Sequence, residues 1–183
     1  MRTSESGQSA LLLLDVVSIL TKEHLDYAVI GAMAASVHGV VRASLDADAI
    51  MSVTTKRLGE LEKSFKNLGL QTELRRGDAD DPIPALLVVN DTFGNRVDLL
   101  AGLRGMDSGV FERAMTVPFQ GETLRVVGRE DFIAMKLFAG GPQDFSDVRR
   151  AIASSENNLD KKLLRQLAKG FGRQTIQALK KFL

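Results

Sequence analysis

The stretch RASLDADAIMSV, residues 42–53, decides the fold of this chain. Its apolar second half is typical of a buried strand, and Asp46 and Asp48 stand one residue apart where that strand begins. Because residues i and i+2 of an extended strand point to the same face, the two carboxylates are expected side by side. A polar strand end that faces solvent would show the same alternation, so the pair needs a second signal.

The second signal is Asp98, which lies inside the apolar run RVDLLAG, residues 96–102. An ionised carboxylate is costly to bury among apolar neighbours unless a positive charge meets it. A hard divalent cation, bound by a few carboxylates and by substrate phosphates, would supply that charge. Asp46, Asp48 and Asp98 together therefore predict a Mg²⁺ (or Mn²⁺) site for phosphate chemistry. Asp98 alone could instead be a structural carboxylate that accepts hydrogen bonds from N–H groups.

A glycine precedes the acidic strand. Residues 26–30 predict a short strand that runs into GAMAASV, residues 31–37, whose alanines and methionine favour a helix. Gly31 permits a sharp strand-to-helix turn and a close backbone approach to a ligand, and the N–H groups of a helix start suit a phosphate. Arg42 and Ser44, in the loop before the acidic pair, are placed to contact a phosphate; an ion pair with an aspartate is an equal alternative for Arg42.

Three stretches resemble the minimal nucleotidyltransferases of the DNA polymerase β superfamily, and within it the AbiEii-like toxins and related nucleotidyltransferase-like proteins. They are VIGAMAASVHGVVRASLDADAIM, RVDLL and EDFIAMKLFAGGPQDFSDV, and the resemblance covers residues 25–152. It implies a mixed sheet flanked by helices. It also implies phosphate contacts at Gly31 and Ala32, metal binding at Asp46, Asp48 and Asp98, a triphosphate contact at Lys136, and a match of Asp144 and Asp147 to the paired acids of these relatives.

Lys136 interrupts an otherwise apolar helix expected over residues 130–139. A lysine in that setting can also be a surface residue whose alkyl stem lies along the apolar face, so both roles stay open. Asp144 and Asp147 share one face of a helix expected over residues 143–153. We expect them to anchor a neighbouring cation such as Lys136 rather than a metal.

Length and composition limit the class of protein. The chain has 183 residues, 44% of them hydrophobic, and no cysteine. It therefore fits one α/β or α+β domain, residues 1–155, with a helical C-terminal extension, residues 156–183, packed on it. No apolar run approaches eighteen residues, so a membrane-spanning helix is not expected, and the absence of cysteine excludes disulfides and cysteine-ligated zinc. A cytoplasmic protein without a membrane partner is the expectation.

The C-terminal extension is basic. Residues 159–183 hold seven Lys and Arg residues against one Asp, although the net charge of the whole chain is only +1. Lys161, Arg165, Lys169 and Arg173 recur every four residues and so share one helical face. A solvated helix face explains this pattern simply, and a basic surface that attracts RNA or an acidic partner is the alternative.

The remaining elements follow from periodicity and turn signals. They are helices over residues 9–24, 56–67 and 107–114, strands over residues 46–53, 71–75, 85–89 and 124–127, a hairpin that leads into the Asp98 strand, and one or two C-terminal helices broken near residues 170–172.

The function that these features predict is metal-dependent transfer of a nucleoside monophosphate from an NTP to a hydroxyl group. The acceptor would be an RNA, with tRNA as one case, or a protein, and the enzyme could be the toxin of a toxin–antitoxin pair with an antitoxin partner. Asp98 could also accept the proton of the attacking hydroxyl. The alternative is a non-catalytic nucleotide- or partner-binding module of the same fold.

Overall fold

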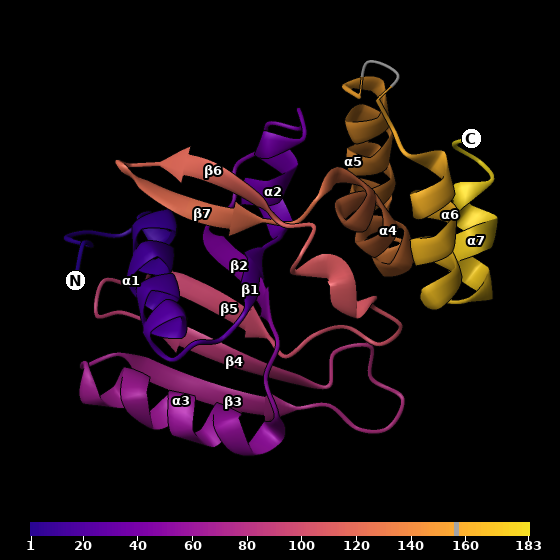
Figure 1. The fold of residues 1–183 in the computed structure, drawn as a ribbon. Helices are drawn as coiled ribbons and strands as arrows, with labels where there is room; N and C mark the ends of the chain where they lie inside the picture. The colour runs from indigo at the N-terminus through magenta and orange to yellow at the C-terminus, as the bar shows by residue number, and fades with distance from the viewer. Residues whose placement is uncertain (156–157) are drawn as a thin grey trace.

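The computed structural model describes residues 1–155 and 158–183. Its strands are β1 (Tyr27–Val29), β2 (Asp46–Met51), β3 (Gln71–Arg76), β4 (Ala85–Asn90), β5 (Arg96–Leu100), β6 (Met115–Phe119) and β7 (Glu122–Val126). They form one seven-stranded sheet in the order β3-β4-β5-β2-β1-β7-β6 (Figure 1). The pairs β2/β5 and β1/β7 are parallel and the other pairs are antiparallel. The mixed sheet flanked by helices confirms the expected fold class.

The helices are α1 (Ser9–Lys22), α2 (Gly31–Val37), α3 (Thr55–Asn67), α4 (Arg129–Ala139), α5 (Pro142–Ala153), α6 (Lys161–Gly170) and α7 (Arg173–Leu179), with a 3₁₀ turn, η1 (Ser108–Val110). α1 packs on β2 and β5, and α3 packs on β3 and β4. α4 contacts α5, α6 and α7, which gives a helical layer at one end of the sheet (Figure 1). α6 and α7 lie on α4. The predicted boundary between the domain and its C-terminal extension, after residue 155, adjoins residues 156–157, which lie outside the described residues.

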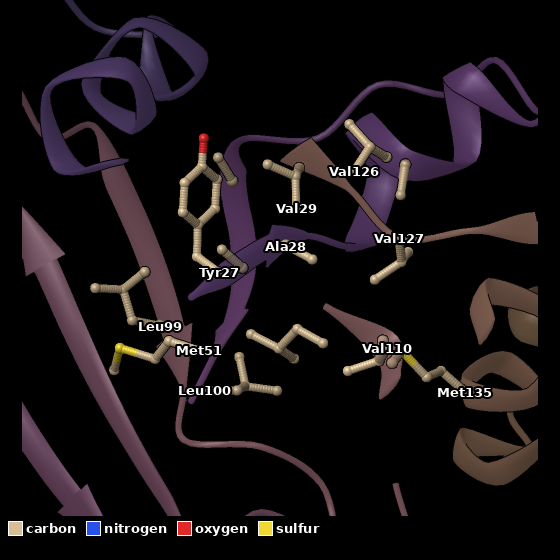
Figure 2. Close-up of a cluster of buried hydrophobic side chains, with 14 of the residues drawn as sticks. Tyr27, Ala28, Val29, Met51, Leu99, Leu100, Val110, Val126, Val127 and Met135 are labelled. Atoms are coloured by element: carbon tan, nitrogen blue, oxygen red, sulfur yellow. The ribbon is translucent and has the colours of Figure 1, made fainter. Parts of the chain in front are cut away.

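The centre of the sheet shows why an apolar strand can carry aspartates. Over the first four residues of β2 and of β5 the side chains alternate between a buried face, which α1 covers, and a partly exposed face. Ala47, Ala49, Val97 and Leu99 fill the buried face. The aspartates therefore fall on the other face by the two-residue period of a strand. Figure 2 shows part of the core where β1, β5 and β7 meet η1 and α4, with Val110 and Met135 among its labelled side chains.

One strand differs from expectation. The structure has a β6–β7 hairpin where the sequence predicts only a strand over residues 124–127, and the helix expected over residues 107–114 is reduced to η1. Pro118 argues against a strand at β6 in the sequence, because proline is rare in strands. It is tolerated here because β6 is an edge strand of the sheet. Gln120 and Gly121 join the two strands with φ values of 50° and 79°, a two-residue turn of the kind that favours a hairpin.

No helix in residues 1–155 and 158–183 has both the length and the apolarity to cross a bilayer.

Candidate active site

The two acidic strands lie next to each other, in parallel and in register. Asp48 on β2 is the direct neighbour of Asp98 on β5, and Asp46 is the direct neighbour of Arg96. Directly paired residues point to the same face, so three carboxylates and one guanidinium form a small cluster on the partly exposed side of the sheet. The sequence prediction that places Asp98 on the face of the Asp46–Asp48 pair agrees with this register.

Asp48 is a partly buried carboxyl group with a raised pKa. Burial, followed by the negative charges of Asp46 and Asp98, raises the pKa of its carboxyl group to about 6, although the positive charges of Arg42 and Lys136 oppose the shift. These contributions show that the three carboxylates sense one another's charge. A site that concentrates negative charge in this way would favour a multivalent cation.

Asp98 is held by an arginine of its own strand. Nε and Nη2 of Arg96 donate to the two carboxylate oxygens of Asp98 at 2.7 and 2.8 Å. Asp46 accepts a hydrogen bond from the Ser44 hydroxyl at 2.9 Å. In the described part of the chain no three His, Cys, Asp or Glu side chains are close enough together to hold a metal ion. The carboxylates thus share a face but do not converge within one metal-site radius, and both oxygens of Asp98 are engaged by Arg96.

Gly31 lies against Asp48. It begins α2 with a φ of +63°, and a Cβ placed on it would lie 2.0 Å from Oδ2 of Asp48. Any other residue would therefore overlap the carboxylate and would also be strained in the left-handed region. The Ile30 N–H donates to the Asp48 carbonyl at 2.9 Å, which fixes the turn beside the acidic strand. The sequence predicts a sharp strand-to-helix turn at Gly31, and the structure has this turn. The predicted approach of its backbone to a phosphate stays a prediction, because the group close to Gly31 is the Asp48 carboxylate.

A cavity of about 290 Å³ opens beside Gly31 and Asp48. Its charged wall carries Arg42, Lys136 and Asp144. Its apolar wall comes from the loop before β4, the end of β5, the loop after β5, and α4. These residues are Ile83, Leu100, Leu103, Phe132, Met135 and Ala139. A concave apolar wall with a few convergent charged groups is the usual form of a small-molecule site.

A buried aspartate holds the two cations of that cavity. Asp147 is completely buried, and its Oδ2 lies 3.0 Å from Lys136 Nζ and 3.6 Å from Arg42 Nε. Lys136 also donates to Asp144 at 2.8 Å, and Gln143 donates to the other oxygen of Asp147 at 2.9 Å. Lys136 is therefore not a surface lysine, since only 13% of its side chain is exposed. Asp144 and Asp147 anchor it, as the sequence predicts.

Arg42 lies between two cavities. It lines the cavity with Asp48 and also a second one, of about 200 Å³, whose lining includes Ala32, Ser44 and Asp46. Its ion-pair partner is Asp147 rather than an aspartate of the β2 pair, and its buried Nε finds no hydrogen-bond acceptor among the described residues. Ser44 and Ala32 thus lie beside Asp46, while Gly31 and Lys136 lie beside Asp48.

The sequence of the chain matches a family described as "Nucleotidyltransferase of unknown function (DUF6036)" over residues 11–179. The chain belongs to this nucleotidyltransferase family. The narrower resemblance to AbiEii-like toxins stays a prediction, because the family that matches is a different one. No curated protein sequence matches significantly.

Solved nucleotidyltransferases share the fold. ANT(2″)-Ia, crystallised with adenylyl-2″-tobramycin, has a TM-score of 0.60 and 18% identity, over 88% of this chain and 95% of its own. A putative nucleotidyltransferase from Thermotoga maritima has a TM-score of 0.58 and 14% identity, over 82% of this chain and 96% of its own. The lincosamide adenylyltransferase LnuA, crystallised with lincomycin, has a TM-score of 0.52 and 9% identity, over 83% of this chain and 99% of its own. At these identities the likeness establishes the fold and not the acceptor.

Two features of this DUF6036 chain's site escape the sequence analysis. The first is the Arg96–Asp98 pair, for which the two-residue spacing on a strand was an available signal. The second is the contact of Asp147 with Arg42, which joins residues 105 positions apart and has no local signal. The apolar cavity wall belongs to the second kind, because its side chains come from several separate elements.

Proposed function

We propose that this chain transfers a nucleoside monophosphate from an NTP to an acceptor hydroxyl, with Asp46, Asp48 and Asp98 as the acidic centre. The observation that carries the proposal is the β2/β5 register, which brings Asp48 beside Asp98 on one face. The space that Gly31 leaves beside Asp48 supports it, because a Cβ would fill that space. Membership of a nucleotidyltransferase family supports the class of reaction.

The donor set fits Mg²⁺ or Mn²⁺ chemically, since both prefer carboxylate oxygens. The three side chains would have to close around the cation, and Asp98 would have to leave Arg96. Asp46 and Asp48 would hold the cation of the nucleotide, and all three aspartates would hold a second one. When bound, such cations supply positive charge to the attacking and leaving oxygens of an in-line phosphoryl displacement.

The chain's own residues would do the rest. Lys136 and Arg42 would offset the negative charge of the triphosphate, and Asp147 keeps both cations at the cavity wall. The backbone of Gly31 and Ala32 would approach the phosphates, with Ser44 orienting Asp46. Asp98 would accept the proton of the acceptor hydroxyl once its carboxylate is free of Arg96. The NTP would lie in the cavity of about 290 Å³, with its base on the apolar wall.

We favour RNA as the acceptor. The basic residues of the C-terminal helices are all exposed, and they are Lys161, Lys162, Arg165, Lys169, Arg173, Lys180 and Lys181. Exposed positive charge attracts a polyanion and releases its counterions. A small hydroxyl compound is the second candidate, because ANT(2″)-Ia and LnuA were crystallised with adenylyl-2″-tobramycin and lincomycin. A protein is a further candidate acceptor. The proposal also includes a role as the toxin of a toxin–antitoxin pair, with an antitoxin partner. We place the reaction in the cytoplasm, where NTP and acceptor would meet.

The test is a labelling experiment. The purified chain is incubated with each α-labelled NTP, Mg²⁺ or Mn²⁺, and in turn cellular RNA, cellular protein and a panel of hydroxyl-bearing small molecules. We expect label in the RNA fraction, and none with the Asp46→Asn/Asp48→Asn variant. Label in the protein or small-molecule fraction would replace RNA as the acceptor. No label in any fraction, with no NTP binding by the wild type, would refute the transferase in favour of a partner-binding module.

A further inference from the structure

The Arg96–Asp98 pair is the strongest feature of the site that the proposed reaction does not use. Its two hydrogen bonds, at 2.7 and 2.8 Å, engage both oxygens of the carboxylate. In the described part of the chain this is the only ion pair that reaches one of the three aspartates. Arg42 and Lys136, the other two cations of the site, form ion pairs with Asp147 and Asp144 instead.

Arg96 neutralises one of three clustered negative charges. Hydrogen bonding to Asp98 raises the pKa of Arg96, and the charges of Asp46 and Asp48 add to that effect. A guanidinium that binds both oxygens of a carboxylate takes the place that a hard cation would need. The two cannot share Asp98 in this geometry, because both of its oxygens already accept from Arg96.

The two partners differ in their freedom to move. The Arg96 side chain is 37% exposed, whereas that of Asp98 is 14% exposed. The guanidinium can therefore turn toward water on the open face of the sheet, while the carboxylate stays beside Asp48. Departure of Arg96 would leave the three carboxylates without an ion-pair partner, which is the arrangement that favours a divalent cation.

We propose that Arg96 is a positioning residue that holds Asp98 in the ligand-free protein and competes with the divalent cation for it. The inference rests on the proposed function, because it assumes that Asp98 binds a metal. The guanidinium reduces the repulsion among the three carboxylates until a cation displaces the guanidinium from Asp98. Arg96 thus sets the cation concentration at which Asp98 joins the site.

The experiment measures Mn²⁺ binding to the nucleotide-free protein, by electron paramagnetic resonance of free Mn²⁺ or by calorimetry. Arg96→Met should tighten binding about fivefold at low salt, the factor that corresponds to a partly exposed ion pair of about 1 kcal/mol. Arg96→Lys keeps the positive charge but loses the two-donor geometry of the guanidinium. Its Mn²⁺ affinity should fall between those of Arg96→Met and the wild type.

Arg75 offers a matched control. On β3 it forms the same two-residue pair with Glu73, at 2.7 and 2.9 Å, but contacts none of the three aspartates. Arg75→Met should tighten Mn²⁺ binding much less than Arg96→Met, because Arg75 acts on Asp98 through its charge at a distance and occupies neither of its oxygens. A purely structural role of Arg96 would lower stability in urea without tightening Mn²⁺ binding, and that result would overturn the inference.

The failure of the inference and that of the proposed function give different results. Wild-type Mn²⁺ binding that Asp48→Asn abolishes but Arg96→Met does not tighten would remove only the role of Arg96. No binding by any of these proteins would remove both. Binding by Arg96→Met alone would establish the competition in its strongest form.

Discussion

The carboxylate of Asp48 should destabilise the folded protein at neutral pH. Its pKa is raised from the ordinary 3.8 to about 6 by burial and by Asp46 and Asp98. The folded state therefore holds a proton between about pH 4 and pH 6 that the unfolded chain releases, so this group's contribution to stability is lost as pH rises through 6. A shift of about two pH units corresponds to a penalty of about 3 kcal/mol above pH 7.

Asp48→Asn removes the ionisation and hence the pH-dependent part of that penalty. By the same linkage, about 2 kcal/mol of the penalty develops between pH 4.5 and pH 8. The stability of the variant relative to the wild type should therefore rise by about 2 kcal/mol between these pH values, even where the amide changes the absolute stability. Titrating groups remote from Asp48 cancel, since both proteins carry them in the same surroundings.

Urea unfolding at pH 4.5 and pH 8 measures this difference. Asp80→Asn, in the exposed loop after β3, is the control, and its stability relative to the wild type should be the same at both pH values within about 0.5 kcal/mol. An Asp48→Asn advantage that stays constant or shrinks at pH 8 would refute the electrostatic account of the site.

Three further outcomes follow from the same contacts. Gly31→Ala should destabilise the protein by about 1–3 kcal/mol in urea and reduce NMP transfer at least tenfold, because its Cβ would lie 2.0 Å from Asp48 Oδ2 at a φ of +63°; a variant with wild-type stability and transfer rate would contradict it. Asp147→Asn should cost about 3 kcal/mol and raise the KM for NTP, since Lys136 loses a buried partner, and an unchanged KM would separate Asp147 from nucleotide binding. Burial lowers the pKa of His38, so protonation of the unfolded chain should reduce stability as pH falls below about 6.5, and His38→Gln should flatten that slope in thermal scans; an equal slope would contradict it.

Sequence reasoning located the strands and helices that carry strong local signals. β2, α3, β4 and α4 begin and end within a few residues of their expected limits, because apolar periodicity and turn residues mark them. β6 was not found, since its strand state depends on pairing with β7 across the Gln120–Gly121 turn more than on its own residues. A glycine turn between two short runs of strand formers was the signal that could have revealed the hairpin.

In the site, too, residues with a local signal can be predicted from the sequence, whereas residues that depend on distant contacts cannot. Asp46, Asp48 and Asp98 can be recognised in the sequence because carboxylates are costly to bury in apolar strands. The raised pKa of Asp48 reflects that cost. Arg96 does not stand out in the sequence, because it compensates the charge of Asp98. Asp147 is predicted to anchor Lys136, but its contact with Arg42 has no local signal.

A residue that is unfavourable for folding can be recognised from its local sequence. The groups that compensate its charge can be identified only in the folded structure. It follows that the compensating groups set how much of the site's negative charge is available to a ligand. Arg96 is the group whose contact with the acidic face can be exchanged most readily, since its side chain is more exposed than that of Asp98. Asp147 is completely buried, so the cations that it holds should stay in place when ligands bind. Ligand-dependent change in this site should therefore concentrate at the Arg96 end of β5, while the Lys136 wall of the cavity remains as it is.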